Sequence, residues 1–370
     1  MRRNVLLVQP DYYSQYPPLG LLKLSSYHKK LGDDTEFVKG IQNAEKEPNI
    51  IYVTSLFTWA WRPVWKAIAY YKRAFPEAEI WLGGLYATLL LEHAELSGID
   101  KSHIFKGVFK KAENLLPDYS LVPKWNGKNW DASIVFSSRG CIRDCGYCAV
   151  PRLEGKICAA KKSIKKLIWK GHRRIIFFDN NFLASPYWRN ILDEVEELAL
   201  RVDFNQGLDS RLFTEEVAKR IARLKIHDVI RLSYDYSQEG TYVKKAIDLL
   251  NKNGIDRRKI LVYTLFNYSE SPEELLQRIR DIFRWGAACY PMRYQPVYAL
   301  EKNKYIAPKW NYNRLELVER ARRVIGYGGA FPPYNGLVDK FERARDFDEA
   351  FALREPVREK NDLCMLRQQN

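Results

Sequence analysis

Cysteine and long hydrophobic runs are scarce in this 370-residue sequence. It has six cysteines, none before Cys141, and their spacing argues against a disulfide scaffold and for a reducing compartment. No stretch reaches the eighteen or more uncharged apolar residues of a membrane span, and the first five residues run directly into a strand-like segment. We therefore expect a soluble, cytoplasmic protein with no membrane association.

Acidic residues are in deficit. Sixty Lys and Arg residues against 45 Asp and Glu give a net charge of +15, which attracts polyanions and acidic partners. The 23 Tyr and 10 Trp could stack on bases, but no RRM, KH or helix-turn-helix signature accompanies them. A solvated basic surface and a nucleic-acid partner both remain open.

Three of the cysteines are crowded into eight residues. Cys141, Cys145 and Cys148 form a CxxxCxxC motif just after the apolar run at 133–136. Thiolates are the usual ligands of iron–sulfur clusters, and a cubane held by protein alone would use four of them. Three cysteines therefore leave one iron with an open position, which is what a catalytic metal site needs.

The main alternative is a structural zinc site. Zinc motifs usually add a second ligand pair downstream, whereas His172 and His227 are isolated in the sequence. A protein that binds nucleic acid and uses these cysteines for a structural metal is therefore the alternative from another functional class.

The CxxxCxxC loop resembles the signature of radical S-adenosylmethionine (SAM) enzymes. The resemblance implies a [4Fe-4S] cluster whose open iron binds the amino and carboxylate groups of SAM. One electron then cleaves SAM into methionine and a 5′-deoxyadenosyl radical. A reductant such as flavodoxin or ferredoxin would supply that electron, and the basic segment at 156–174 could dock an acidic donor.

The N-terminal third alternates strand and helix patterns. Strands are expected near residues 4–8, 35–38, 50–54, 80–82 and 103–105, with helices near 18–31, 65–75 and 89–96. This alternation predicts a doubly wound, Rossmann-like parallel sheet with a ligand crevice beyond the carboxyl ends of its strands.

This third resembles the cobalamin-binding-like domain that precedes many radical SAM barrels. The resemblance rests on the Pro17–Gly20 helix start and the turn from Trp81 to Thr88. The Asp-x-His-x-x-Gly loop that gives cobalt a histidine is missing, and Asp11–Ser14 stands in its place. His28 is expected at a helix surface or cap. Cobalamin held without a histidine, and no cobalamin at all, both stay open.

From residue 133 the alternation resumes on a larger scale. Six strand patterns with helical patterns between them predict a partial (β/α)6 TIM-type barrel, which is the radical SAM architecture. We expect a Rossmann-like domain at 1–123, the barrel at 124–300 and a helical extension at 301–370. The linker at 114–130 carries several aromatic residues and should pack across the two domains. The Gly- and Pro-rich turn at 326–333 either covers the open side of the barrel or packs the preceding helix onto it.

Polar residues follow the second barrel strand, where functional groups of parallel barrels gather. Asp179, Asn180 and Asn181 occupy the position at which the resembling family binds the SAM amino group. Helix capping is the structural alternative for this triplet.

Other strand ends carry further candidates. Arg211 could bind a carboxylate of SAM or substrate as a fork, or else pair with Asp209. By the resemblance, Ser233 and Asp235 match the ribose-contacting position and Tyr147 the residue beside adenine. Arg293 and Gln295 on the sixth strand are expected to contact substrate, and no catalytic residue is assigned.

The predicted function is reductive cleavage of SAM at one cluster, followed by radical chemistry on an unidentified substrate. With cobalamin bound, methyl transfer or rearrangement follows from the resemblance; an RNA-modifying radical SAM enzyme without cobalamin is the alternative. A second cluster is not expected, because Cys158, Cys289 and Cys364 are scattered and read as buried small hydrophobes.

Overall fold

A four-stranded parallel sheet forms the N-terminal part of this computed structural model, which describes residues 2–326 and 334–352. Its strand order is β2-β1-β3-β4, so the order reverses beside β1. The strands are β1 (Asn4–Gln9), β2 (Asp34–Lys39), β3 (Ile50–Ser55) and β4 (Glu79–Gly84). The doubly wound sheet expected from the sequence is therefore confirmed, and in sheets of this order ligands bind beyond the carboxyl ends of the strands where the order reverses, here β1 and β3.

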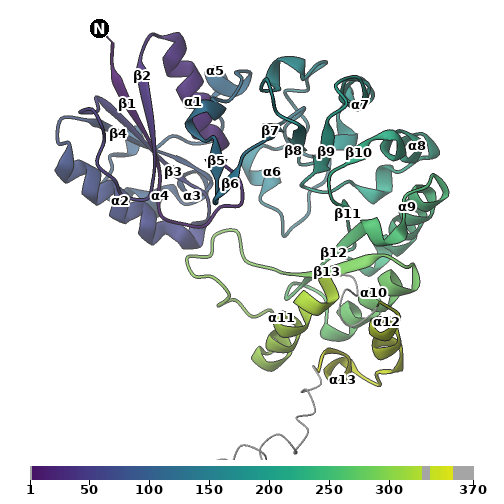
Figure 1. Cartoon of the computed structure of the whole chain (residues 1–370). Helices are drawn as coiled ribbons and strands as arrows, with labels where there is room; N and C mark the ends of the chain where they lie inside the picture. The colour runs from purple at the N-terminus through teal and green to yellow at the C-terminus, as the bar shows by residue number, and fades with distance from the viewer. Residues whose placement is uncertain (1, 327–333, 353–370) are drawn as a thin grey trace, which may run out of the picture.

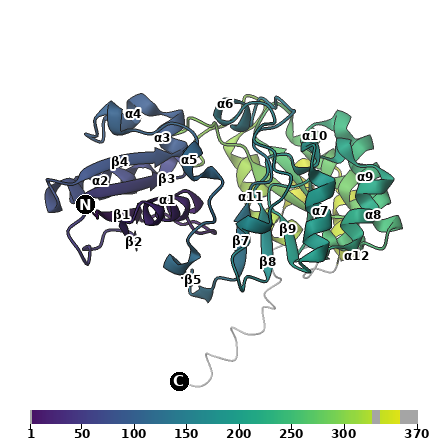
Figure 2. The ribbon, with the colours of Figure 1, turned by 90° about the horizontal axis from the view of Figure 1, so that it is seen from above.

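The two faces of this sheet are covered by different helices. Val5 and Leu7 of β1 pack with Leu21 of α1 (Leu19–Lys30). Leu6 and Val8 alternate to the other face, where the buried side of α2 (Trp61–Ala74) covers them. Figure 2 shows α1 and α2 over the area of this sheet.

Two expected N-terminal elements differ. The strand expected at 103–105 is a 3-10 turn, η2 (Lys101–His103), followed by a single bridge between Ile104 and Leu82. The Asp100 carboxylate accepts a hydrogen bond from Ser102 N at 2.8 Å and winds the chain into this turn. The helix expected at 89–96 is divided into α3 (Leu85–Leu89) and α4 (Leu91–Glu95).

The segment after α5 (Lys110–Glu113) packs between the two halves of the molecule, as expected. It contains the 3-10 turn η3 (Tyr119–Leu121) and the hairpin of β5 (Lys124–Trp125) and β6 (Lys128–Asn129). Tyr119 and Trp125 are buried with Leu22 of α1 in one cluster, and the Tyr119 hydroxyl accepts a hydrogen bond from Ile134 N at 2.7 Å.

Parallel strands form an open arc in the second half of the chain (Figure 1). One sheet has the order β10-β9-β8-β7 and the next β11-β12-β13, and Leu208 N donates to Arg231 O across the step between them. The strands are β7 (Ala132–Val135), β8 (Arg174–Phe177), β9 (Arg201–Phe204), β10 (Lys225–Ile226), β11 (Ile230–Ser233), β12 (Ile260–Phe266) and β13 (Ala288–Arg293). The partial barrel is confirmed, with the short β10 added to the six expected strands.

Four helices cover the outside of this arc: α7 (Trp188–Glu197), α8 (Glu215–Arg223), α9 (Gly240–Lys252) and α10 (Pro272–Arg284). The first crossover has instead only the short α6 (Val150–Leu153) and a 3-10 turn, η4 (Lys165–Leu167), within the segment 164–169 whose apolar pattern predicts a helix.

The C-terminal extension is helical, as expected. Helices α11 (Tyr312–Gly326), α12 (Tyr334–Arg343) and α13 (Phe347–Phe351) pack their apolar faces on the barrel core. The turn expected at 326–333 lies, apart from Gly326, outside the described residues. No helix among the described residues is both long and apolar enough to span a bilayer.

Candidate functional site

The cysteine loop begins where β7 reaches the carboxyl edge of the arc. Cys141, Cys145 and Cys148 are free thiols of intermediate exposure on this one loop. Two backbone N–H groups already point at sulfur: Arg143 N lies 3.3 Å from Cys141 Sγ, and Val150 N lies 3.4 Å from Cys148 Sγ. Such donors stabilise thiolates, and hydrogen bonds to sulfur are among the groups that tune iron–sulfur clusters.

No three His, Cys, Asp or Glu side chains in the described part of the chain converge as the ligands of a single metal ion do. Cubane ligands differ in this respect, because each cysteine binds a different iron. Burial raises the pKa of the Cys145 and Cys148 thiols, so these groups would lose protons on metal binding.

Backbone hydrogen bonds close the base of the loop. Arg139 and Cys158 exchange two bonds of 2.9 Å, and Cys141 N donates to Gly155 O at 3.0 Å. Gly140 lies between these pairs with a φ of +75°, and an added Cβ would lie 2.1 Å from Lys156 O. Only glycine fits this position, and the tight base holds the cysteine segment out toward the rim.

Asp179 holds the entry to the loop. Its carboxylate accepts bonds from Ser137 N at 2.9 Å and Ser138 N at 2.7 Å, and from both serine hydroxyls. Burial raises the pKa of this carboxyl against the effect of those four donors. In this structure the carboxylate is therefore occupied by the chain itself.

Asn180 and Asn181 both face the loop. Asn180 Nδ2 donates to Glu154 Oε2 at 2.8 Å. Asn181 Nδ2 lies 3.6 Å from Cys141 Sγ and 3.1 Å from Asp209 Oδ2. Asn181 Oδ1 is buried and has no hydrogen-bond partner. A buried acceptor without a donor is costly, so this oxygen marks a place for an incoming N–H group.

Asp209 is the polar centre of the rim, a role that the sequence analysis did not assign. Its Oδ2 accepts from Arg143 Nε and its Oδ1 from Arg211 Nε, each at 2.8 Å. Burial would raise the pKa of this carboxyl, but the two guanidinium groups hold it below its usual value. Arg211 also donates to Glu239 Oε1 at 3.0 Å, so the pairing alternative for Arg211 is the arrangement seen.

Tyr147 and Asp235 form a second polar pair. The Tyr147 hydroxyl donates to Asp235 Oδ2 at 2.7 Å, and Leu265 N donates to Asp235 Oδ1 at 2.9 Å. Burial raises the pKa of Asp235 to about 6, although the Tyr147 bond opposes this shift. Burial and the nearby Asp235 charge raise the pKa of Tyr147. Ser233, expected beside Asp235, is exposed at the end of β11.

Tyrosine rings line the rim next to this pair. The Tyr147 ring centroid lies 6.0 Å from that of Tyr236 and 5.7 Å from that of Tyr268. Tyr268 continues to Tyr294 at 4.7 Å. A Cβ added at Gly146 would lie 2.6 Å from the Tyr268 hydroxyl oxygen, so the loop and this wall are closely fitted. The wall offers flat surfaces on which planar rings stack.

A long loop after β13 uses the groups expected to contact substrate. Arg293 Nη2 donates to Asn303 O at 3.0 Å. Gln295 Nε2 donates to Asn303 Oδ1 at 2.9 Å, and the backbone N of Asn303 donates to Gln295 Oε1 at 3.0 Å, which closes the loop base. At the loop tip, Ala299 O accepts from Thr58 Oγ1 at 2.6 Å in the N-terminal half. Figure 1 shows this green loop reaching that half. Arg293 and Gln295 thus anchor a bridge between the halves.

His28 is buried, which corrects the expected surface or capping position. Its Nδ1 lies 2.8 Å from Asp33 Oδ2 and its Nε2 lies 3.0 Å from the Tyr52 hydroxyl. Both ring nitrogens are engaged inside the N-terminal half. The helix pattern places His28 on α1 but does not reveal these partners, because they lie on other strands and turns.

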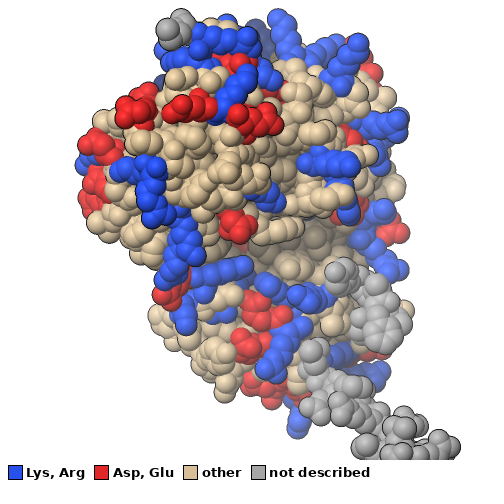
Figure 3. Space-filling model, turned by 60° about the vertical axis from the view of Figure 1, so that its left-hand side comes forward, with Lys and Arg blue, Asp and Glu red and all other residues tan. Residues whose placement is uncertain are grey.

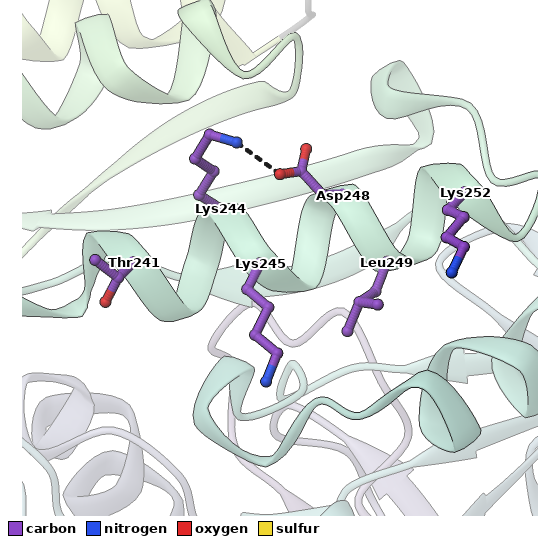
Figure 4. A pocket seen from close by; sticks show the side chains of 6 residues that line it. All are labelled: Thr241, Lys244, Lys245, Asp248, Leu249 and Lys252. Atoms are coloured by element: carbon purple, nitrogen blue, oxygen red, sulfur yellow. Dashed lines mark hydrogen bonds and ion pairs between the residues drawn. The ribbon is translucent and has the colours of Figure 1, made fainter.

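Two surface features away from the rim are weaker candidates for a functional site. A shallow hollow of about 380 Å³ lies on the outer face of α9, lined by Lys244, Lys245 and Lys252 with Asp248 among them (Figure 4). On the face in Figure 3, basic side chains are interspersed with acidic ones rather than forming one band. The hollow does not adjoin the cysteine loop in sequence.

We expect Asp235 to make the stability of the protein pH-dependent. Between about pH 4 and 6 the folded carboxyl keeps a proton that the unfolded chain has lost, so this group lowers the free energy of unfolding as pH rises. The free energy of unfolding should fall by an amount on the order of 2 to 3 kcal/mol across that pH window, and we expect Asp235→Asn to remove this decrease. Urea unfolding at pH 4.5 and 7.5 measures it, with the exposed Asp193→Asn as control. Equal pH dependence in both variants would contradict this.

Comparison with known proteins supports the fold. No family model matches the chain. Two structures of the radical S-adenosylmethionine methyltransferase TsrM from Kitasatospora setae superimpose with TM-scores of 0.59 and 0.57 at 16% and 15% identity. They cover 80% of this chain and 77% and 75% of TsrM; one has cobalamin and a [4Fe-4S] cluster bound, the other tryptophan substrate and a SAM analog. The chain thus shares the fold of TsrM over 80% of its length.

One curated protein also matches part of the sequence. The 65-kDa microtubule-associated protein 6 of Arabidopsis thaliana is 26% identical over 137 residues, or 36% of this chain. The chain spans about a fifth of that protein's length, since the match covers 22% of it. This short match places the chain in no family.

Proposed function

We propose that this protein is a radical SAM enzyme whose Cys141, Cys145 and Cys148 hold a [4Fe-4S] cluster. The observation that carries the proposal is the buried, unpartnered Asn181 Oδ1 beside Cys141 Sγ. Three free thiols, two backbone N–H groups aimed at sulfur and an acceptor without a donor fit a cluster with SAM next to it. When bound, such a cluster supplies the electron that cleaves SAM.

The residues around the loop then have separate tasks. Arg143 N and Val150 N donate to the sulfurs and favour their thiolate form. Asn181 Oδ1 would accept a hydrogen bond from the SAM amino group, and the Tyr147–Asp235 pair would hold the adenosine. Asp179 and Asp209 position these groups, because the chain's own donors already occupy their carboxylates. Ser233 and Arg211 remain candidates for contacts with the ribose and the carboxylate.

Anaerobic reconstitution tests the proposal. The purified protein should take up about four irons, turn brown and, with dithionite, convert SAM to methionine and 5′-deoxyadenosine. A colourless protein that binds zinc and leaves SAM intact would refute the proposal and favour a structural metal.

Cobalamin-dependent methyl transfer is the finer reaction that we propose. Three adjacent strands end in apolar groups: Tyr13 after β1 is 75% exposed, Leu85 after β4 is 38% exposed, and the Phe57 and Trp59 rings after β3 stack 4.9 Å apart. Exposed apolar side chains grouped at one edge mark a binding surface, and a flat corrin ring fits it. Since both His28 nitrogens are engaged, cobalamin would bind without this histidine on cobalt.

Hydroxocobalamin binding tests this surface. We expect Leu85→Glu to weaken binding about tenfold or more, because burying the new carboxylate costs at least ~1.4 kcal/mol. Spectral titration with quenching of Trp fluorescence measures it. Leu96→Glu, at an apolar side chain that is 70% exposed elsewhere, should bind like the wild type. Absent binding by wild-type protein would leave the cobalamin-free alternative, with RNA among its substrates.

The reductant is proposed to dock on the first crossover. Exposed cations follow the cysteine loop there, among them Lys156, Lys162, Lys166, Lys170 and Arg173. The only carboxylate between Cys148 and Arg173 is Glu154, which is paired with Arg139. An acidic donor such as flavodoxin should therefore reduce the protein more slowly as salt rises, by stopped-flow absorbance, and Lys166→Glu should slow it further. Salt-independent reduction would refute docking here.

A further inference from the structure

A line of buried and partly buried ion pairs runs from the N-terminal half to the cysteine loop. Lys23 of α1 donates to Glu113 O at 2.7 Å and to Glu113 Oε2 at 3.1 Å. Glu113 closes α5, and Arg139, two residues before Cys141, donates to both of its carboxylate oxygens at 2.9 and 3.0 Å. Lys23 and Glu113 are each 8% exposed, so solvent screens this contact little.

Arg139 carries the connection into the loop. Its Nη1 donates to Glu154 Oε1 at 2.9 Å. The other Glu154 oxygen accepts from Gly140 N at 2.9 Å and from Asn180 Nδ2 at 2.8 Å. The guanidinium carbon also lies 3.4 Å from the Phe136 ring centroid. One planar fork thereby joins two carboxylates at a fixed angle, which a lysine could not do.

The energetics favour a positioning role over simple stabilisation. Burying an ion pair costs desolvation that often equals the attraction gained, so a hydrophobic contact would hold the two halves as well. Backbone bonds already close the loop base. The ion pairs additionally fix the orientation of the loop base relative to the N-terminal half, because the Arg139 side chain joins that base to the Glu113 carboxylate outside the barrel.

We propose that Glu113 of the N-terminal half is a positioning residue for the cluster loop. The proposal rests on the proposed function. Glu113 orients Arg139, and Arg139 orients Glu154 and the Gly140 N–H next to the first cysteine. The loop and the N-terminal sheet then move as one rigid unit. A ligand bound at the edge of that sheet would therefore keep a constant distance and orientation relative to the cluster.

Iron release from the reconstituted protein tests the proposal. We expect Glu113→Gln to speed release to a ferrous chelator about tenfold, which corresponds to only ~1.4 kcal/mol of easier loop opening. The EPR signal of the reduced cluster should broaden and respond less to added SAM. Arg139→Lys keeps the charge but loses the fork, so its release rate should lie between those of wild type and Glu113→Gln.

Asp33→Asn is the matched control. Asp33 is also buried in the N-terminal half and pairs with Arg3 at 2.7 Å, but none of its contacts reaches the loop. It should lower the melting temperature and leave iron release and the EPR signal unchanged. Equal effects of Asp33→Asn and Glu113→Gln, or wild-type release from Glu113→Gln, would overturn the proposal. A wild-type protein that takes up no iron would instead overturn the proposed function.

Discussion

Replacing Cys145 with alanine is expected to leave the protein colourless after reconstitution and to abolish SAM cleavage. Cys145 lies between the other two proposed ligands on a loop whose base is fixed, so no neighbouring thiol is placed to substitute for it. Loss of residues that merely support metal ligands commonly costs about 10- to 100-fold, and loss of a ligand should exceed this. Iron analysis and quantification of 5′-deoxyadenosine measure the effect, and the Cys141 and Cys148 variants should behave alike.

Cys158→Ala is the matched control for this experiment. Cys158 lies at the base of the same loop and bonds to Arg139 through its backbone alone, while its thiol is exposed. Its replacement should leave iron content and SAM cleavage at wild-type values. Iron retained by Cys145→Ala, or iron lost equally from Cys158→Ala, would contradict the assignment of the three ligands.

Local patterns in the sequence predicted the elements that carry the candidate site. The cysteine spacing, the strand before it and the polar ends of later strands are properties of short segments, and the sheets confirm the expected parallel order. Buried Cys289 agrees with a small hydrophobe, exposed Cys158 does not, and Cys364 lies outside the described residues. A thiol's exposure depends on what covers it, which a lone cysteine does not reveal.

Partners distant in sequence were harder to predict. Asp179 accepts hydrogen bonds from Ser137 and Ser138, which are 42 and 41 residues away in sequence. Asp209 accepts one from Arg143, which is 66 residues away. A strand-end carboxylate offers no local sign of whether a chain donor or a ligand will occupy it. The partner of Gln295 was equally unpredictable. It is Asn303, which lies in the loop after the strand, and the strand pattern does not indicate that loop.

Gly140→Ala is expected to prevent cluster binding although it changes no ligand. The new Cβ would lie 2.1 Å from Lys156 O and 2.7 Å from Gly155 O, both rigid backbone atoms of the loop base. Relief requires the Gly155–Lys156 turn to move, which breaks the bond from Cys141 N to Gly155 O. We expect a loss of about 3 kcal/mol in loop stability, with iron content near zero.

Gly155→Ala is the control that separates the steric contact of the new Cβ at position 140 from the strain of an alanine with positive φ. Gly155 lies in the same base with a φ of +70°, and no atom lies within 4 Å of its added Cβ. Its replacement should cost only the ~1 to 2 kcal/mol of a left-handed alanine and retain most of the iron. Hydrogen exchange of the Cys141 amide and iron analysis distinguish the two variants. Because both glycines have positive φ, equal iron loss would mean that backbone strain, not contact with Lys156 O, decides whether the loop closes around a cluster.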